Sequence, residues 1–275
     1  MDWTEVLFLL TLLLYAVASV ALLAGYIGCN SRAKTAASVI SLAAFAVHTV
    51  LLAAVMSGAW ESTGRSWYLL PLSWAFVGIG VIMWQWQKTT VQLLFIPPVA
   101  FILLMVALLS DTNGIGSTQA MTGPIFTLHL ISVSIGLGLI TVAAGAAVIF
   151  LWQQKKLKAK AALSGLRNDL PAMTTLDRIN GLATLTGFPF YSLGLICGFA
   201  WARLAWGTVF SGDPKEIVSI AIWALYALLF HQRQALGWRG RKPALMALGL
   251  FGASLFSLLV VNFLLPTRHA FLFTL

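Results

Sequence analysis

Charged residues are scarce in this sequence. Only 9% of the 275 residues are Asp, Glu, Lys or Arg, whereas 60% are hydrophobic, and the mean hydropathy is +0.91. A water-soluble domain of this size needs far more charge to cover its surface. The composition therefore excludes an ordinary soluble protein and predicts that lipid surrounds most of the chain.

Cysteine is scarce as well, and no Cys-x-x-Cys motif is present for redox or metal chemistry. The two cysteines, Cys29 and Cys197, fall at different predicted depths, so we expect no disulfide between them. The start of the chain also lacks the basic residues of a signal peptide, because Asp2 and Glu5 stand there instead. We therefore expect the first apolar stretch to be a retained helix.

Long apolar stretches dominate the rest of the chain. A helix needs about 20 mainly apolar residues to cross a hydrocarbon core of roughly 30 Å, and such runs are too long for barrel strands. The sequence predicts an all-α integral membrane protein with a single domain, 1–275, that has four spans in 1–110 and a second part over 125–269. The eight predicted spans are 4–27, 35–57, 68–87, 90–110, 125–152, 181–206, 217–235 and 244–265.

The positions of Lys and Arg predict the orientation. If the N-terminus is outside, most of the 17 basic residues fall in inner loops, and the outer side keeps only Arg65, Arg203, Lys215 and Arg268. The positive-inside rule then places both termini on the outer side. We expect a multi-pass protein of the cell (inner or plasma) membrane or of a thylakoid-type membrane. The net charge of +9 follows from this topology, so no nucleic-acid partner is expected.

Three polar connections separate the predicted spans, namely 110–123 outside, 153–180 inside and 207–216 outside. In the inner connection we expect the fifth span to continue as a helix, then a break at Pro171. A separate short helix should follow, capped near Thr174 or Thr175.

The chain has four histidines, and the predicted topology sorts them into two pairs. His48 and His231 fall within spans, where ionisable residues are rare and indicate function by default, whereas His129 and His269 fall on the outer side. Two facing imidazoles can hold both axial positions of a haem iron. Alternatively, each histidine is satisfied by a nearby carbonyl or serine. The predicted depths of His48 and His231, which differ by more than about 10 Å, also count against a pair.

Ordered motifs run through the second half of the chain. They are GPIFTLHLISVSIGLGL, LDRINGLATLTGFPFYSLGLICGFAWARLAWG, the outer loop WGTVFSGDPKE, and LFHQRQALGWRGR. In this order and at this spacing they resemble the cytochrome c assembly family, the CcsA/CcmC/HemX group of haem-handling membrane proteins. The resemblance covers the second half of the chain well and the first four spans only loosely.

The resemblance implies a set of haem ligands. His129 and His269 match the two outer histidines that ligate haem above the membrane in this family, and His231 matches a ligand within the membrane. His48 is the natural candidate for the partner of His231. The implied cofactor is non-covalent haem b, with its iron held by these four histidines.

The outer loop 207–216, together with Trp206, departs from the family pattern. Trp206 and Asp213 are kept, but Val209, Phe210 and Gly212 stand where the family has Tyr, Trp and Trp. Phe210 can still stack on a porphyrin, although one aromatic ring is lost outright. The resemblance implies that Asp213 orients a ligand or the acceptor; the alternative is a plain solvated turn before a proline.

The function implied by the resemblance is to bind haem and deliver it to the outer face for attachment to apocytochrome c. A CcsB/ResB-like membrane subunit is then expected, so the chain is not an enzyme alone but a possible part of a holocytochrome c synthase complex. Haem, this subunit, apocytochrome c and membrane lipid are the expected partners. Two alternatives stay open: a HemX-like accessory or regulator of tetrapyrrole synthesis, which the altered loop favours, and a cofactor-free small-molecule transporter.

Overall fold

The computed structural model describes residues 3–28, 30–57, 69–87, 95–109, 123–159, 170–261 and 265. Within these ranges every regular element is a helix and there is no strand, as predicted. The helices are α1 (Trp3–Ile27), α2 (Ser31–Met56), α3 (Leu69–Gln87), α4 (Ile96–Leu109), α5 (Pro124–Lys158), α6 (Met173–Trp206), α7 (Pro214–Gln234) and α8 (Arg241–Leu255), and a π-helical turn, η3 (Phe256–Val261), continues α8.

Six of these helices are long and apolar enough to cross a membrane, and the apolar parts of α3 and α4 are shorter. Many leucine, isoleucine and valine side chains are exposed along their outer faces. Such surfaces are stable in lipid and unstable in water. The prediction of a multi-pass helical membrane protein is confirmed.

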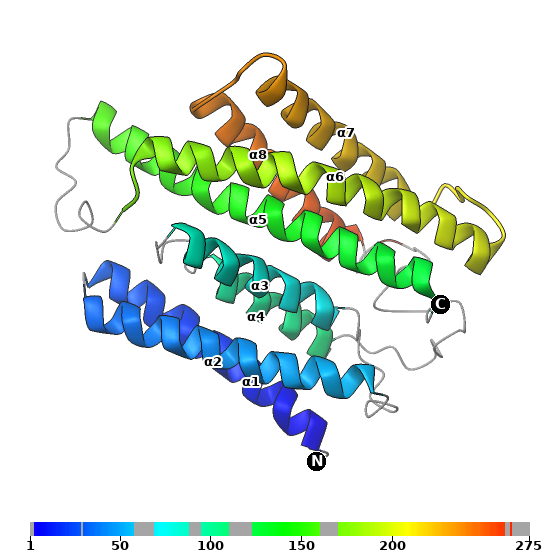
Figure 1. Cartoon of the computed structure of the whole chain (residues 1–275), viewed down its shortest axis with the longest axis horizontal. Coiled ribbons are helices and arrows are strands. Elements are labelled where there is room, and N and C mark those ends of the chain that lie inside the picture. Colours follow the sequence, from blue (N-terminus) through cyan, green and yellow to red (C-terminus); the bar gives the residue numbers. More distant parts are fainter. Residues whose placement is uncertain are drawn as a thin grey trace.

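The helices form layers (Figure 1). Helices α1 and α2 lie together along one side, α3 and α4 come next, and the long antiparallel pair α5 and α6 crosses the middle. Helix α7 lies on the other side, and α8 passes behind α6 and α5 in this view and packs on α5 and α7. The most extensive contact is that between α5 and α6. Glycines permit it, because a Cβ at Gly136 would lie 2.9 Å from Cβ of Tyr191, and a Cβ at Gly194 would lie 2.6 Å from Cγ2 of Val133. Small residues allow membrane helices to approach this closely.

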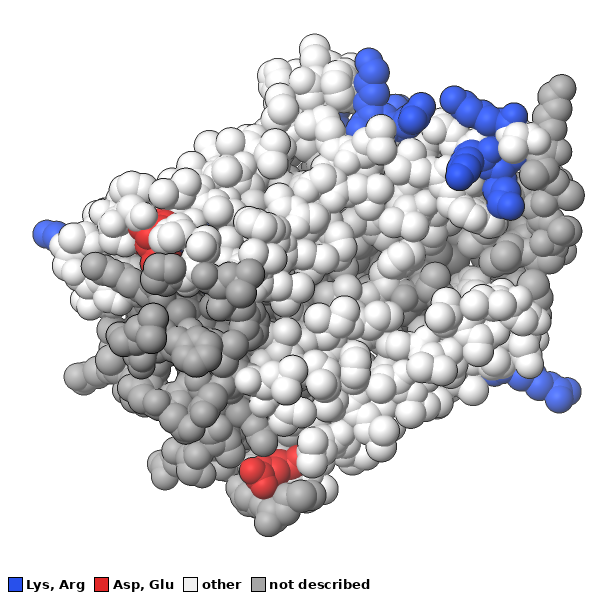
Figure 2. Space-filling model, turned by 180° about the vertical axis from the view of Figure 1, so that it is seen from behind, with Lys and Arg blue, Asp and Glu red and all other residues white. Residues whose placement is uncertain are grey.

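Basic side chains gather at one end of the bundle. Figure 2 shows most of the visible Lys and Arg residues at the end opposite to the one that carries a visible acidic patch. The last turn of α5 contributes Lys155, Lys156 and Lys158. The connection from α7 to α8, which lies against the start of α6, carries Arg239. The positive-inside rule predicts that this end faces inward, so we call it the inner end; the orientation stays a prediction.

One local prediction is wrong. Helix α5 does continue to Lys158, but no separate short helix begins near Thr174 or Thr175. Instead α6 runs unbroken from Met173, and its N-cap residue, Ala172, makes no side-chain cap. The reason is packing, since Leu176 and Ile179 are buried in the core at this inner end. The 34 residues of α6 span about 50 Å, so it extends beyond the hydrocarbon layer.

Candidate functional site

The imidazole of His129 is held at the outer end of α5. Its Nδ1 lies 2.7 Å from the carbonyl oxygen of Gly194 on α6. Because a carbonyl only accepts, Nδ1 must donate, so the neutral ring carries its lone pair on Nε2. This second-sphere hydrogen bond is the one that metal-ligating histidines usually make.

The ring of His129 rests on Gly198. A Cβ at this position would lie 2.8 Å from both Cε1 and Nδ1 of the imidazole. Any larger residue would therefore push the ring away from α6. The backbone of α6 thus fixes both the tautomer and the place of His129.

Aromatic side chains continue from His129 to the outer loop. Phe126 lies 6.4 Å from the His129 ring and 5.1 Å from Trp201, and Trp201 meets Trp206 edge-on at 4.9 Å, all measured between ring centroids. Phe210, in the loop, is 52% exposed and lies 6.5 Å from Phe199. An exposed phenyl ring in this loop is suited to contact a flat, apolar ring system.

Glycines shape the loop 207–216. Gly207 ends α6 with φ +75°, and Gly212 has φ +74°. Residues with side chains rarely adopt this left-handed conformation. A tryptophan at position 212, as in the family pattern, would be strained in this backbone, which gives a physical reason for the glycine.

Two buried carboxylates hold the same loop. Asp213 is the N-cap of α7 and accepts a hydrogen bond of 2.8 Å from the backbone nitrogen of Lys215. Glu216 accepts from the backbone nitrogen of Ser211 at 2.8 Å and from its hydroxyl at 3.0 Å. Asp213 therefore has a defined structural role, while its predicted role toward haem stays a prediction. The other outer histidine, His269, lies outside the described residues.

His48 is completely buried on α2. Its Nδ1 lies 3.1 Å from the hydroxyl of Tyr15 on α1, and the two rings meet edge-on at 5.8 Å. The carbonyl of Leu70 on α3 is near the ring, but Nε2 makes no hydrogen bond with any described residue. A buried nitrogen without a partner is unusual. In the tautomer whose Nδ1 donates to the Tyr15 oxygen, Nε2 carries the lone pair and can bind a ligand.

His231 has the opposite surroundings. It lies three residues before the end of α7, and its side chain is exposed. Helix α7 packs against α6 and α8, whereas α2 packs against α1 and α3. The middle helices separate α2 from α7 in Figure 1, so the structure does not bring His48 and His231 together. That these two share one haem stays a prediction.

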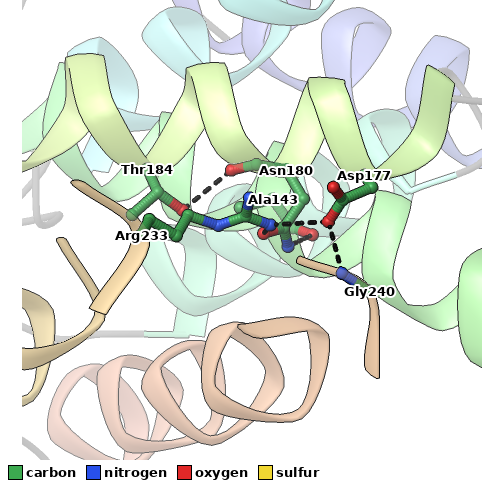
Figure 3. Close-up of polar contacts among 6 residues, drawn as sticks. All are labelled: Ala143, Asp177, Asn180, Thr184, Arg233 and Gly240. Atoms are coloured by element: carbon green, nitrogen blue, oxygen red, sulfur yellow. Dashed lines mark hydrogen bonds and ion pairs between the residues drawn. The ribbon is translucent and has the colours of Figure 1, made fainter. Parts of the chain in front are cut away.

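A polar network at the inner end joins three helices (Figure 3). Arg233 on α7 forms an ion pair of 3.0 Å with Asp177 on α6 and also donates to the side-chain oxygen of Asn180. Asn180 donates to the backbone oxygen of Ala143 on α5 at 2.8 Å. The same oxygen of Asp177 accepts from the backbone nitrogen of Gly240 at 2.9 Å. The sequence analysis missed this network, although opposite charges near the inner ends of neighbouring spans were a usable signal.

A comparison with known families decides where the chain belongs. A family model described as "Cytochrome C assembly protein" matches residues 3–269. The chain belongs to the cytochrome c assembly protein family. The resemblance noted in the sequence is therefore confirmed over nearly the whole chain.

Curated relatives in this family are named cytochrome c biogenesis protein CcsA. The protein from Prochlorococcus marinus (strain AS9601) is 36% identical over 140 residues, which are 45% of each chain. The protein from Microcystis aeruginosa (strain NIES-843 / IAM M-2473) is 39% identical over 115 residues, which are 42% of this chain and 34% of the relative. The matched part thus spans less than half of each relative. These matches support a role in cytochrome c biogenesis.

The outer end of this assembly-family chain carries the kinds of side chain that haem needs. Within the described ranges, no three His, Cys, Asp or Glu side chains are grouped as metal ligands. Haem brings four of its own nitrogen ligands and needs from a protein only axial donors and apolar contacts. His129 with Phe126 against its ring, and the exposed Phe210 in the outer loop, are side chains of these two kinds.

Proposed function

We propose that this chain binds haem non-covalently at its outer end and presents it to an apocytochrome c for covalent attachment. The observation that carries the proposal is the hydrogen bond from Nδ1 of His129 to the Gly194 carbonyl, which leaves the lone pair on Nε2. Histidines that ligate a metal usually have their second ring nitrogen held by such a hydrogen bond. Haem is the cargo, and most of the attachment chemistry belongs to it and to the acceptor.

Each outer residue has a proposed part. His129 supplies one axial ligand, and His269 supplies the second. Phe210 and Trp206 contact the porphyrin face, because Phe210 is exposed and Trp206 ends α6 beside the loop. Asp213 holds the start of α7 and thereby the shape of the loop.

The membrane histidines are proposed as further ligands. His48 offers a buried Nε2 that makes no hydrogen bond within the described part of the chain. His231 is exposed on the surface of α7, so a neighbouring membrane subunit can reach it. A CcsB/ResB-like subunit is the proposed partner, in a plasma (inner) or thylakoid-type membrane.

The outer site is tested by removing the imidazole of His129. In purified His129→Gly protein we expect the low-spin haem absorption of this site to fall about tenfold or more. Free imidazole should restore it. Leu128→Ala is the matched control, because Leu128 is the exposed neighbour of His129 on α5. An unchanged spectrum in His129→Gly and in the three other single histidine variants would refute haem ligation by this chain.

One structural observation favours a second function. Val209 and Gly212 leave Phe210 as the one aromatic side chain in the loop 207–216, which suits a HemX-like haem-binding accessory. The two functions differ in one result. A haem-delivery protein restores covalent c-type cytochromes in a strain that lacks its own assembly protein, whereas an accessory binds haem but restores none.

A further inference from the structure

The rotation of α7 about its own axis decides which way His231 faces. Successive residues of an α-helix are rotated by about 100°, so His231 and Arg233 point to nearly opposite sides. The side chain of Arg233 is only 7% exposed and faces α6, whereas that of His231 is exposed. Whatever fixes Arg233 therefore also fixes the direction of His231.

Asp177 fixes Arg233 and the following turn with one oxygen atom. Its Oδ1 lies 3.0 Å from Nη2 of Arg233 and 2.9 Å from the backbone nitrogen of Gly240. Gly240 has φ +76° and is the N-cap of α8. One carboxylate thus ties the end of α7 and the start of α8 to the same point on α6, as Figure 3 shows.

Asn180 adds a second contact one turn further along α6. Its oxygen accepts from Arg233, and its amide nitrogen donates to the Ala143 carbonyl on α5. Gly181 leaves room for the guanidinium, because a Cβ there would lie 3.0 Å from Nη1 of Arg233. Arg233 is therefore held by two side chains of α6, one of which, Asn180, is itself fixed to α5.

A buried ion pair of this kind adds little stability, and in some proteins it instead contributes conformational specificity. Its desolvation offsets much of the attraction between the charges, and apolar replacements of both partners are often neutral. We propose that Asp177 and Arg233 are positioning residues, whose ion pair sets the rotation of α7 and holds His231 facing outward. This inference rests on the proposed role of His231 as a haem ligand.

The first experiment uses the full-length protein in its native membrane complex. The His231-dependent signal is the low-spin haem absorption that His231→Gly loses and free imidazole restores. In Asp177→Asn the imidazole of His231 is present but misdirected. We therefore expect about a tenfold loss of this signal, with recovery in free imidazole. Gln153→Ala is the matched control, since Gln153 forms a hydrogen bond to Pro171 at the inner end without touching α7.

A double variant separates positioning from folding. Asp177→Asn combined with Arg233→Met removes both charges, so its thermal stability should return close to that of the parent. The His231-dependent signal should stay low, because no ion pair directs α7. A double variant that regains both stability and signal would overturn the inference. An Asp177→Asn variant that keeps the His231-dependent signal of the parent would also overturn the inference. That result would leave the proposed haem role of His231 intact.

A second measurement does not depend on haem. A spin label is placed at position 231 through His231→Cys, in a background with Cys29→Ser and Cys197→Ala. We expect adding Asp177→Asn to increase the mobility of this label and Gln153→Ala to leave it unchanged. If His231→Gly leaves the haem spectrum unchanged, the proposed haem role of His231 fails. The mobility of the label still tests whether the ion pair of Asp177 and Arg233 sets the rotation of α7. Equal mobility with and without Asp177→Asn would refute it.

Discussion

Helices α1–α4 and α5–α8 hold their histidines in different ways. In the first group, His48 is fully buried and forms a hydrogen bond with the hydroxyl of Tyr15. In the second group, His129 is half-buried against α6, and His231 is exposed on α7. A buried imidazole is part of the packing, whereas a partly exposed one can meet a ligand without displacing the core. Loss of the buried histidine should therefore cost stability as well as haem binding, whereas loss of an exposed histidine should affect haem binding alone.

The largest effect on stability is expected at His48. Replacing it with Ala creates a cavity and leaves the Tyr15 hydroxyl without its partner, so we expect a loss of about 3 kcal/mol in the free energy of unfolding. Denaturation with SDS in bicelles measures this. Val50→Ala is the control, because Val50 is exposed on the same helix. A loss of less than about 1 kcal/mol for His48→Ala would mean that the two groups do not differ in this way.

The next effect is expected at Gly198, which lies under the ring of His129. Its replacement by Ala places a Cβ 2.8 Å from the imidazole, so the ring must move. We expect this to lower the free energy of unfolding by about 1–2 kcal/mol. The outer haem absorption should fall with it. Gly249→Ala is the matched control, since a Cβ there meets nothing within 4 Å, and we expect it to be neutral or to stabilise by about 0.5 kcal/mol. Equal behaviour of the two variants would contradict the packing of His129 on α6.

The sequence predicted the spans well because run length and hydropathy report directly on the thickness of the bilayer. It placed the start of α6 eight residues too late, at 181 instead of Met173. The polar residues Asp177 and Asn180 interrupt the apolar pattern there, and their partners in other helices make them compatible with a position between packed helices. Hydropathy records each residue alone and carries no information on such partners.

The candidate site was predictable to a similar degree. The rarity of histidine in an apolar chain pointed to His48, His129 and His231, but a position within a span gives depth and not direction. Whether a histidine faces Tyr15, a backbone carbonyl or the surface depends on helix rotation, which here follows from contacts such as Arg233 with Asp177. The pairing of His48 with His231 is therefore a matter for experiment.

A smaller effect is expected at Asp213, in the outer loop of the second group. Asp213→Ala removes the N-cap of α7 and should cost about 1 kcal/mol, whereas Asp213→Ser can still cap the helix. If Asp213 acts only through the cap, Ser restores both stability and outer haem binding. If Asp213→Ser restores stability but not haem binding, the carboxylate of Asp213 takes a direct part in holding haem. Thermal unfolding and the haem spectrum of both variants decide between these results.

The smallest change in stability is expected for His231→Ala. Its comparison with His48→Ala is the most informative test of the difference between the two groups. The side chain is exposed, and no buried packing is lost in His231→Ala, so the unfolding curve should match that of the parent protein. If His231 nevertheless ligates haem, the same variant loses an absorption band without losing stability. His48→Ala would lose both. A large destabilisation in His231→Ala would instead show that α7 is packed against another subunit at this point, because only then would an exposed imidazole on this chain contribute to the fold.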